Sequence, residues 1–128
     1  MSTGCRHTGL WDLCTFEKRL KQAGFVTKLI ETEKPRRAGF TPLPTVYTVG
    51  RARLEVFLYR DAETMTRDLA ALDTLTVAPR GANASWEGTP MLIRSGNLAA
   101  VFLPQNPRQA ERLALAITAG APQPGSPR

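Results

Sequence analysis

The sequence predicts an α+β fold, a two-layer domain in which helices cover one face of a single antiparallel sheet. Short β-rich runs are joined by tight-turn residues, so successive strands must be antiparallel, and amphipathic helical stretches need a sheet face for their apolar stripes. The second half of the chain also echoes the first at an offset of 45 residues, since Val56-Phe57-Leu58 aligns with Val101-Phe102-Leu103. We therefore expect a pseudo-repeat of α-β-β-β units followed by a C-terminal helix.

A chain of 128 residues is long enough for one domain with its own core. We expect a flexible N-terminal segment over residues 1–11, a folded domain over residues 12–120, and a disordered tail over residues 121–128, which contain three prolines. The net charge of +6 favours anionic partners such as nucleic acid, phospholipid head groups or acidic proteins. No apolar run reaches the ~18 residues typical of a membrane-spanning helix.

The first helix is predicted to start at Asp12 or Thr15, whose side chains can accept hydrogen bonds from the first turn, and to stop at Gly24. Its apolar positions follow helical spacing: Phe16, Leu20 and Ala23. A strand is expected over residues 25–31. The charged, proline-containing connection over residues 32–45 is long for a compact domain, which indicates a functional or mobile segment.

Two hairpins are predicted, one over residues 46–59 around Arg51-Ala52 and one over residues 91–104 around Gly96-Asn97. Gly and Asn both tolerate the positive φ that tight primed turns require. A further strand is expected over residues 84–87. In the first hairpin, Thr48, Arg53 and Glu55 point away from an apolar core face formed by Tyr47, Val49, Leu54, Val56 and Leu58.

Two further helices are expected, each directly after a hairpin. Asp61 is predicted to cap the first, which ends at Ala71 or Leu72, and Asn106 to cap the second, with Pro107 at its first position and Gly120 at its end. Their apolar stripes are formed by Met65, Leu69 and Leu72 and by Ala110, Leu113, Ala114 and Ile117.

The second hairpin is apolar on both faces. Transferring the core face of the first hairpin by the 45-residue offset turns these side chains toward the helices: Leu92, Arg94, Ala99, Val101 and Leu103. The opposite face is then a candidate binding face for a partner protein, a hydrophobic ligand or a second copy in a homodimer, and consists of Met91, Ile93, Leu98, Ala100 and Phe102, joined by Phe57. Two alternatives stay open: the two hairpins differ in facing, or a segment such as residues 40–44 covers this face.

The N-terminal sequence Thr3-Gly4-Cys5 looks like the end of a bacterial lipobox, in which the cysteine becomes the acylated first residue of a lipoprotein. On that reading Cys5 is the lipid attachment site and the chain is membrane-anchored. The alternatives are a chance Gly-Cys pair and a disulfide between Cys5 and Cys14, which an oxidising compartment would permit. An acylated Cys5 could not form that disulfide.

No catalytic, metal or cofactor site is predicted. The residues of ligand type cluster only near the N-terminus, as Cys5, His7, Asp12 and Cys14, and their spacing offers three zinc ligands where a structural site wants four. His7 is the only histidine, and no serine or cysteine accompanies it in a known triad pattern. The sequence therefore predicts a protein that is not an enzyme.

Residues 13–119 resemble a group of small bacterial extracytoplasmic proteins, often lipoproteins, without an assigned activity. The resemblance lies in the first helix, the proline-containing segment before Val46-Tyr47-Thr48-Val49-Gly50, the two hairpins and the isolated Trp86. It implies an α+β fold and a location in the cell envelope, and it carries over no catalytic residues.

We therefore expect a non-enzymatic binding module of the bacterial cell envelope that acts through its sheet face and the connection over residues 32–45. Candidate basic contacts in that connection are Lys34, Arg36 and Arg37. The alternative is a cytoplasmic nucleic-acid-binding domain, in which Phe57 and Phe102 stack on bases and the backbone is bound by Lys18, Arg19 and Lys21 with those three residues.

Overall fold

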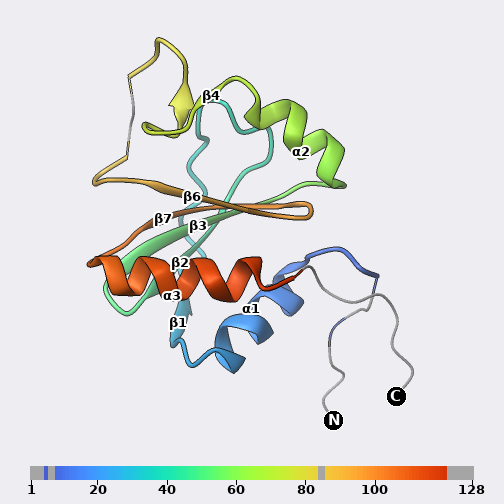
Figure 1. Cartoon of the computed structure of the whole chain (residues 1–128), viewed down its shortest axis with the longest axis vertical. Helices are drawn as coiled ribbons and strands as arrows, with labels where there is room; N and C mark the ends of the chain where they lie inside the picture. The colour runs from blue at the N-terminus through green and yellow to red at the C-terminus, as the bar shows by residue number, and fades with distance from the viewer. Residues whose placement is uncertain (1–4, 6–7, 84–85, 121–128) are drawn as a thin grey trace.

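The computed structural model describes residues 5, 8–83 and 86–120. Within them the elements follow in this order: α1 (Leu13–Gln22), β1 (Thr27–Leu29), β2 (Thr45–Val49), β3 (Ala52–Leu58), α2 (Ala62–Leu69), β4 (Leu72–Asp73), β5 (Ala78–Pro79), β6 (Met91–Ser95), β7 (Leu98–Leu103) and α3 (Pro107–Thr118). The main sheet has five strands in the order β1-β2-β3-β7-β6, all antiparallel, and β4 pairs with β5 in a small separate sheet (Figure 1). The predicted α+β class with an antiparallel sheet is confirmed.

Helices lie on both faces of the main sheet, so the expected placement on one face is wrong. The core cluster on one face joins the sheet to α1 and α3, whereas the cluster on the other face joins it to α2, β4, Val77 and Phe40 from the connection between β1 and β2. Figure 1 shows α1 and α3 on one side of the strands and α2 with β4 on the other. Both faces of the main sheet are therefore covered by packed helices.

The facing of the second hairpin follows from the pairing of β3 with β7. Leu54 pairs with Phe102 and Val56 pairs with Ala100, and paired residues of neighbouring strands share a face. Each β3–β7 pair joins two even-numbered or two odd-numbered residues, and side chains alternate along each strand. Two residues separated by the odd offset of 45 therefore lie on opposite faces. Phe102 therefore lies with Leu54 under α1 and α3, and Val101 lies on the face of α2.

The predicted exposed binding face is consequently wrong. Ile93, Leu98 and Phe102 belong to the core beneath α1 and α3, Met91 packs partly buried against the same cluster, and Phe57 is buried on the other side of the sheet. The ring of Phe40 stacks on Phe57 at 4.1 Å between centroids. The first open alternative thus holds, because the two hairpins differ in facing. The second holds only for Phe57: Phe40 packs on the α2 face, and the remaining residues of the predicted binding face are covered by α1 and α3 instead.

The pseudo-repeat is not confirmed. A hairpin followed by a helix does occur twice, as β2-β3-α2 and β6-β7-α3, but the two helices pack on opposite faces of the sheet. The strands between α2 and β6 pair only with each other. Of the strand expected over residues 84–87, residues 84–85 lie outside the described residues and Trp86 and Glu87 are not in a strand.

The predicted N-terminal caps of the three helices and the stop of the first helix at Gly24 are confirmed. Asp12 caps α1 and forms a reciprocal capping box with Thr15, Asp61 and Asn106 cap α2 and α3, and Gly24 follows α1 with φ +90°. α2 is shorter than expected and ends at Leu69, and β1 covers only the middle of the strand expected over residues 25–31.

The turn of the first hairpin is Gly50-Arg51, one residue earlier than predicted, because Val49 pairs with Ala52. Moving a two-residue turn by one position changes the residue that each strand residue pairs with by two positions. Because side chains alternate with period 2, every side chain stays on its predicted face. The expected core face is therefore confirmed, with Tyr47, Val49, Leu54 and Val56 buried in one cluster and Leu58 packed against it.

The N-terminal segment expected to be flexible contributes to the core in its described part. Trp11 is buried, packs edge-on against Phe16 and is hydrogen-bonded by Asn97 of the turn between β6 and β7. The tail over residues 121–128, expected to be disordered, lies outside the described residues.

We predict that Phe102→Ala lowers the free energy of unfolding by about 3–5 kcal/mol, since removal of a fully buried phenylalanine forfeits burial and leaves a cavity. Denaturant unfolding measures the change. Leu115→Ala is the control, because Leu115 is exposed on α3 and surface substitutions usually cost less than ~0.5 kcal/mol. Equal, small effects of the two variants would contradict the position of Phe102 in the core.

Candidate functional site

A buried carboxylate lies at the centre of the sheet face that carries α2. Glu55 of β3 is 1% exposed and accepts hydrogen bonds at 2.8 Å from the Nε groups of both Arg37 and Arg53. A second guanidinium nitrogen of Arg37 completes a two-pronged ion pair with Glu55. Because an unpaired buried charge is costly, these arginines are what permits a glutamate inside an apolar strand.

Next to this ion pair lies a pocket of about 130 Å³, lined by Glu33, Arg37, Arg53, Glu87 and Leu103. Arg53 bridges the buried and exposed parts, since its guanidinium also lies 2.7 Å from a carboxylate oxygen of the half-exposed Glu33. Burial would lower the pKa of Arg53, but its hydrogen bonds to Glu55 and Glu33 outweigh burial and raise that pKa. Arg53 therefore carries a permanent positive charge at the pocket, between the carboxylates of Glu33 and Glu55.

Trp86 supports the pocket from behind Arg37. The guanidinium of Arg37 lies over the indole ring at 4.3 Å from its centroid, a cation–π contact. The indole nitrogen donates to the carbonyl oxygen of Val77 at 2.9 Å, which fixes the ring against the turn between β4 and β5. Arg37 is thus held on one side by Glu55 and on another by an aromatic face.

The connection between β1 and β2 is fastened to α2 as well as to β3. The backbone N–H and the hydroxyl of Thr41 donate to Asp68 at 2.7 and 2.9 Å, and the hydroxyl of Tyr59 donates to the same carboxylate. Burial alone would raise the pKa of Asp68, but these hydrogen bonds outweigh burial and lower it below its usual value of 3.8. Burial, and then the bond to Asp68, raise the pKa of Tyr59.

Of the predicted basic contacts, only Arg37 lies in the pocket. Lys34 and Arg36 are exposed, and Arg36 donates to the carbonyl oxygen of Thr41 in its own connection. The sequence reasoning missed Glu33, Glu87 and the ion pair of Arg53 with Glu55. A glutamate inside the apolar run Leu54-Glu55-Val56-Phe57-Leu58 was the available signal, because such a residue requires a cationic partner if both faces of the strand are buried.

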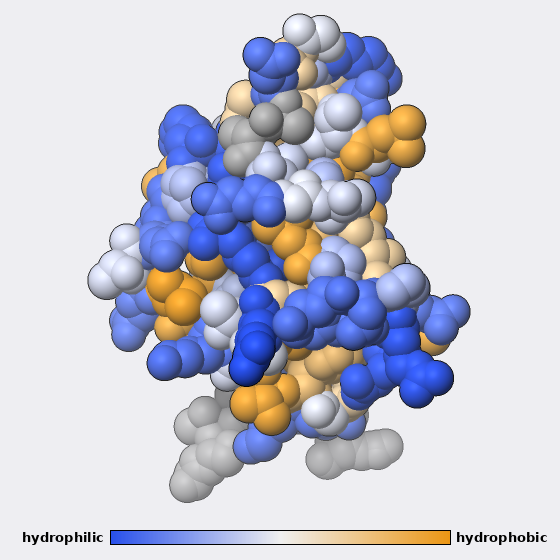
Figure 2. Space-filling view, turned by 90° about the vertical axis from the view of Figure 1, so that its left-hand side faces the viewer, coloured by the Kyte–Doolittle hydropathy of each residue, from blue (hydrophilic) through white to orange (hydrophobic). Residues whose placement is uncertain are grey.

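The two aromatic residues that were proposed to stack on nucleic-acid bases are not accessible. Phe57 and Phe102 are fully buried and present no ring to a nucleic acid. Arg19 donates to the carbonyl oxygens of Ala116 and Gly120 and lies over the ring of Trp11. On the face shown in Figure 2, hydrophobic residues form small separate patches among hydrophilic ones.

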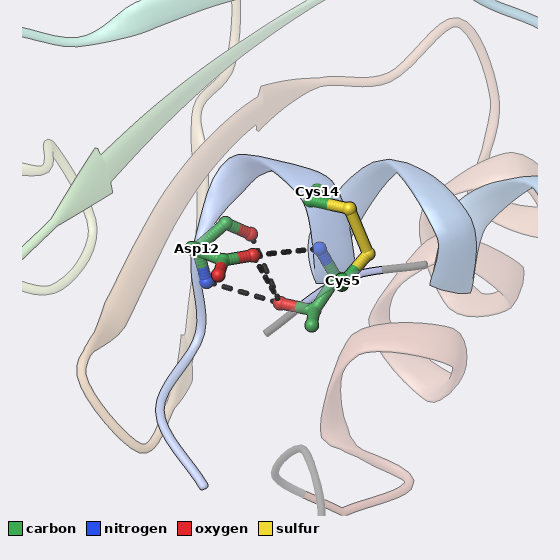
Figure 3. Close-up of a disulfide and its surroundings, with 4 residues drawn as sticks. Cys5, Asp12 and Cys14 are labelled. Atoms are coloured by element: carbon green, nitrogen blue, oxygen red, sulfur yellow. Dashed lines mark hydrogen bonds between the residues drawn. A yellow bond between two sulfur atoms is a disulfide. The ribbon is translucent and has the colours of Figure 1, made fainter. Parts of the chain in front are cut away.

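At the N-terminus, Cys5 and Cys14 form a disulfide with their Cα atoms 5.4 Å apart (Figure 3). The thiol of Cys5 is therefore used, and the prediction of lipid attachment at Cys5 is corrected in favour of the disulfide alternative. His7 of the weighed metal cluster lies outside the described residues. A carboxylate oxygen of Asp12 lies within 4.8 Å of both sulfurs.

Searches with models of known protein families, among curated proteins and among solved structures find no match to the chain. Among the described residues, no helix is both long and apolar enough to span a membrane.

We predict that Glu55→Gln lowers the free energy of unfolding by about 2–3 kcal/mol, somewhat less than the ~3–5 kcal/mol typical of breaking a fully buried pair, because both arginine partners retain some contact with water. Denaturant unfolding measures the change. Glu63→Gln is the control, since the pair of Glu63 with Arg67 is exposed and worth less than ~0.5 kcal/mol. An unchanged stability of Glu55→Gln would contradict the structural role of this ion pair.

We predict that Asp68 makes the protein less stable in acid. Its pKa is lower in the folded than in the unfolded chain, so its contribution is fully present above the unfolded value near pH 4 and is lost as the pH falls through the folded value. Unfolding free energies measured from neutral pH down to about pH 3 should fall less steeply for Asp68→Asn than for the wild type. Identical slopes would show that Asp68 is not hydrogen-bonded in this way.

Proposed function

We propose that the protein is a non-enzymatic binding module of the bacterial cell envelope, and that its site is the pocket lined by Glu33, Arg37, Arg53, Glu87 and Leu103. The expected sheet face is buried under α1 and α3, so binding is assigned to the pocket on the opposite face of the sheet. The observation that carries the proposal is the buried Glu55, which holds two arginines in fixed positions at the pocket wall. Preorganised charged groups lower the cost of ordering a site on binding.

The charges of the pocket favour a small zwitterion of the amino-acid type, either as a free molecule or as the end of a peptide. An anion alone would be attracted to the arginines but repelled by Glu33 and Glu87. A cation alone would be attracted to the two glutamates but repelled by the arginines. A ligand carboxylate beside Arg53 and a ligand ammonium beside Glu33 or Glu87 satisfy both signs at once.

The size of the pocket agrees with such a ligand. Its volume of about 130 Å³ approaches the ~150 Å³ of an engineered cavity that holds benzene, which corresponds to about six non-hydrogen atoms. Glycine and alanine fall within this range. Leu103 supplies one apolar wall, which accommodates a short aliphatic side chain.

The extracytoplasmic location is supported by the disulfide between Cys5 and Cys14, because disulfides persist mainly in oxidising compartments. None of the five side chains that line the pocket carries a hydroxyl, thiol or imidazole group, so its lining holds no serine-, cysteine- or histidine-type nucleophile. With Cys5 in a disulfide, the proposal contains no lipid anchor at that residue.

The test is an NMR titration of the isotope-labelled protein with glycine or alanine. We predict saturable shifts of the indole N–H signal of Trp86, because the neighbouring Arg37 touches the ligand, while the buried Trp11 serves as internal reference. Acetate and methylammonium, each with one sign of charge, should bind more weakly than either amino acid. A short peptide compared with the free amino acid distinguishes the two sources of the zwitterion.

Arg53→Gln should abolish the shifts, and Glu33→Gln should weaken binding with little effect on folding, since Glu33 is half-exposed. Arg67→Gln is the matched control, because Arg67 is an exposed arginine paired with Glu63 on α2. Equal binding by the wild type and Arg53→Gln, or the absence of saturable shifts, would overturn the proposal.

A further inference from the structure

Two cysteines and a carboxylate meet at the start of α1. One oxygen of Asp12 and the sulfurs of Cys5 and Cys14 all lie within 4.8 Å of one another, and Figure 3 shows Asp12 beside the disulfide. Thiolates and carboxylates are both ligands of zinc. In the disulfide each sulfur is bonded to the other, so the group cannot supply thiolates until that bond is broken.

We propose that reduction of the Cys5–Cys14 disulfide creates a site for one thiophilic divalent cation of the zinc class, with Cys5, Asp12 and Cys14 as ligands. Reduction by a phosphine in water breaks the sulfur–sulfur bond and yields two thiols and one phosphine oxide. The two thiols release their protons as two metal–sulfur bonds form, and the carboxylate adds a third bond without proton release. Water completes the tetrahedral coordination. Disulfide formation and metal binding therefore exclude each other.

Asp12 can serve the helix and the metal together. Its Oδ1 accepts hydrogen bonds from the backbone N–H of Thr15 at 2.8 Å and from the Thr15 hydroxyl at 3.0 Å. No described residue donates a hydrogen bond to Oδ2, which leaves this oxygen for the metal. The bonds to Oδ1 orient the carboxylate, which is the effect that outer-shell hydrogen bonds have on metal ligands.

The helix N-terminus favours the charges that the site needs. Cys14 is in the first turn of α1, where the positive end of the helix dipole stabilises nearby negative charge, including that of a metal-bound thiolate. Two thiolates, one carboxylate and one divalent cation carry a net charge of −1, which the positive end of the helix also stabilises.

The site keeps its framework when the disulfide is reduced. The backbone N–H of Trp11 donates to Oδ1 of Asn97 at 2.7 Å, Nδ2 of Asn97 donates to the carbonyl oxygen of Trp11 at 3.1 Å, and the indole nitrogen donates to Ser95 at 3.1 Å. These bonds, and the burial of the Trp11 ring, do not involve either cysteine. Asp12 and Cys14 therefore remain in place, and Cys5 closes the site from the preceding segment.

The full chain, reduced with a phosphine, is titrated with Cd²⁺ and with Co²⁺, whose thiolate complexes absorb light. We expect one ion per chain with thiolate-to-metal absorption, displacement by Zn²⁺, release of protons on binding, and no such absorption with the oxidised protein. Circular dichroism of the reduced protein checks that it remains folded.

Asp12→Asn separates the ligand role from the capping role, because asparagine caps a helix as well as aspartate does but lacks the carboxylate. This variant should bind the ion at least ~10-fold more weakly, since even an outer-shell substitution typically costs that much. Asp61→Asn is the matched control, because Asp61 caps α2 with a similar bond to Thr64, and it should bind as the wild type does.

Cys14→Ser should lose the absorption. The proposal is overturned if the reduced wild type binds no stoichiometric ion, if one ion bridges two chains, or if Asp12→Asn binds as tightly as the wild type. The last outcome also covers an unfolded reduced chain, in which two cysteines alone would capture the metal and Asp12 would make no difference.

Discussion

The ion pair of Glu55 with Arg37 and Arg53 is the interaction on which one whole side of the molecule depends. Glu55 is in the middle of an apolar strand, where its charge is tolerable only if cationic groups reach it. Arg53 is two residues away on the same strand, but Arg37 must come from the connection after β1. Pairing therefore draws that connection onto the sheet, places Phe40 on Phe57, and brings Glu33 to the edge of the pocket. The connection over residues 32–45, which the sequence indicates to be functional or mobile, therefore covers the core on the α2 face of the sheet.

The sequence predicted the elements well because their signals are local. Capping residues, turn glycines and apolar spacing act over a few neighbours, and these correctly located three helices and two hairpins. The facing of the second hairpin was wrong because facing depends on how β3 and β7 pair, which is a contact between distant segments. Asn97 illustrates the same limit. Its turn was predicted from a tolerance for positive φ, yet only Gly96 has positive φ, and Asn97 instead uses its side chain to hold Trp11 and Tyr59.

The candidate site was predictable only in part, for the same reason. Arg37 was identified from its place in a basic connection, but its partners Glu55 and Trp86 are 18 and 49 positions away along the chain. Composition cannot tell a solvated arginine such as Arg36 from one that neutralises a buried carboxylate. The disulfide was foreseen as an alternative because two cysteines in a small chain suffice to suggest it. Choosing it over acylation required the position of Cys5 relative to α1.

The two proposed sites lie at opposite ends of β7. The N-terminal cluster is held through Trp11 by Asn97, directly before Leu98, whereas the pocket is bounded by Leu103. Five steps along a strand place these ends about 17 Å apart. Groups at that separation that share no partner usually act additively. Tyr59 links the two faces, since its backbone bonds Asn97 and its hydroxyl bonds Asp68, but it belongs to neither ligand set. Reduction of the disulfide should therefore leave the charges and volume of the pocket unchanged, and the two sites can be studied separately in one protein.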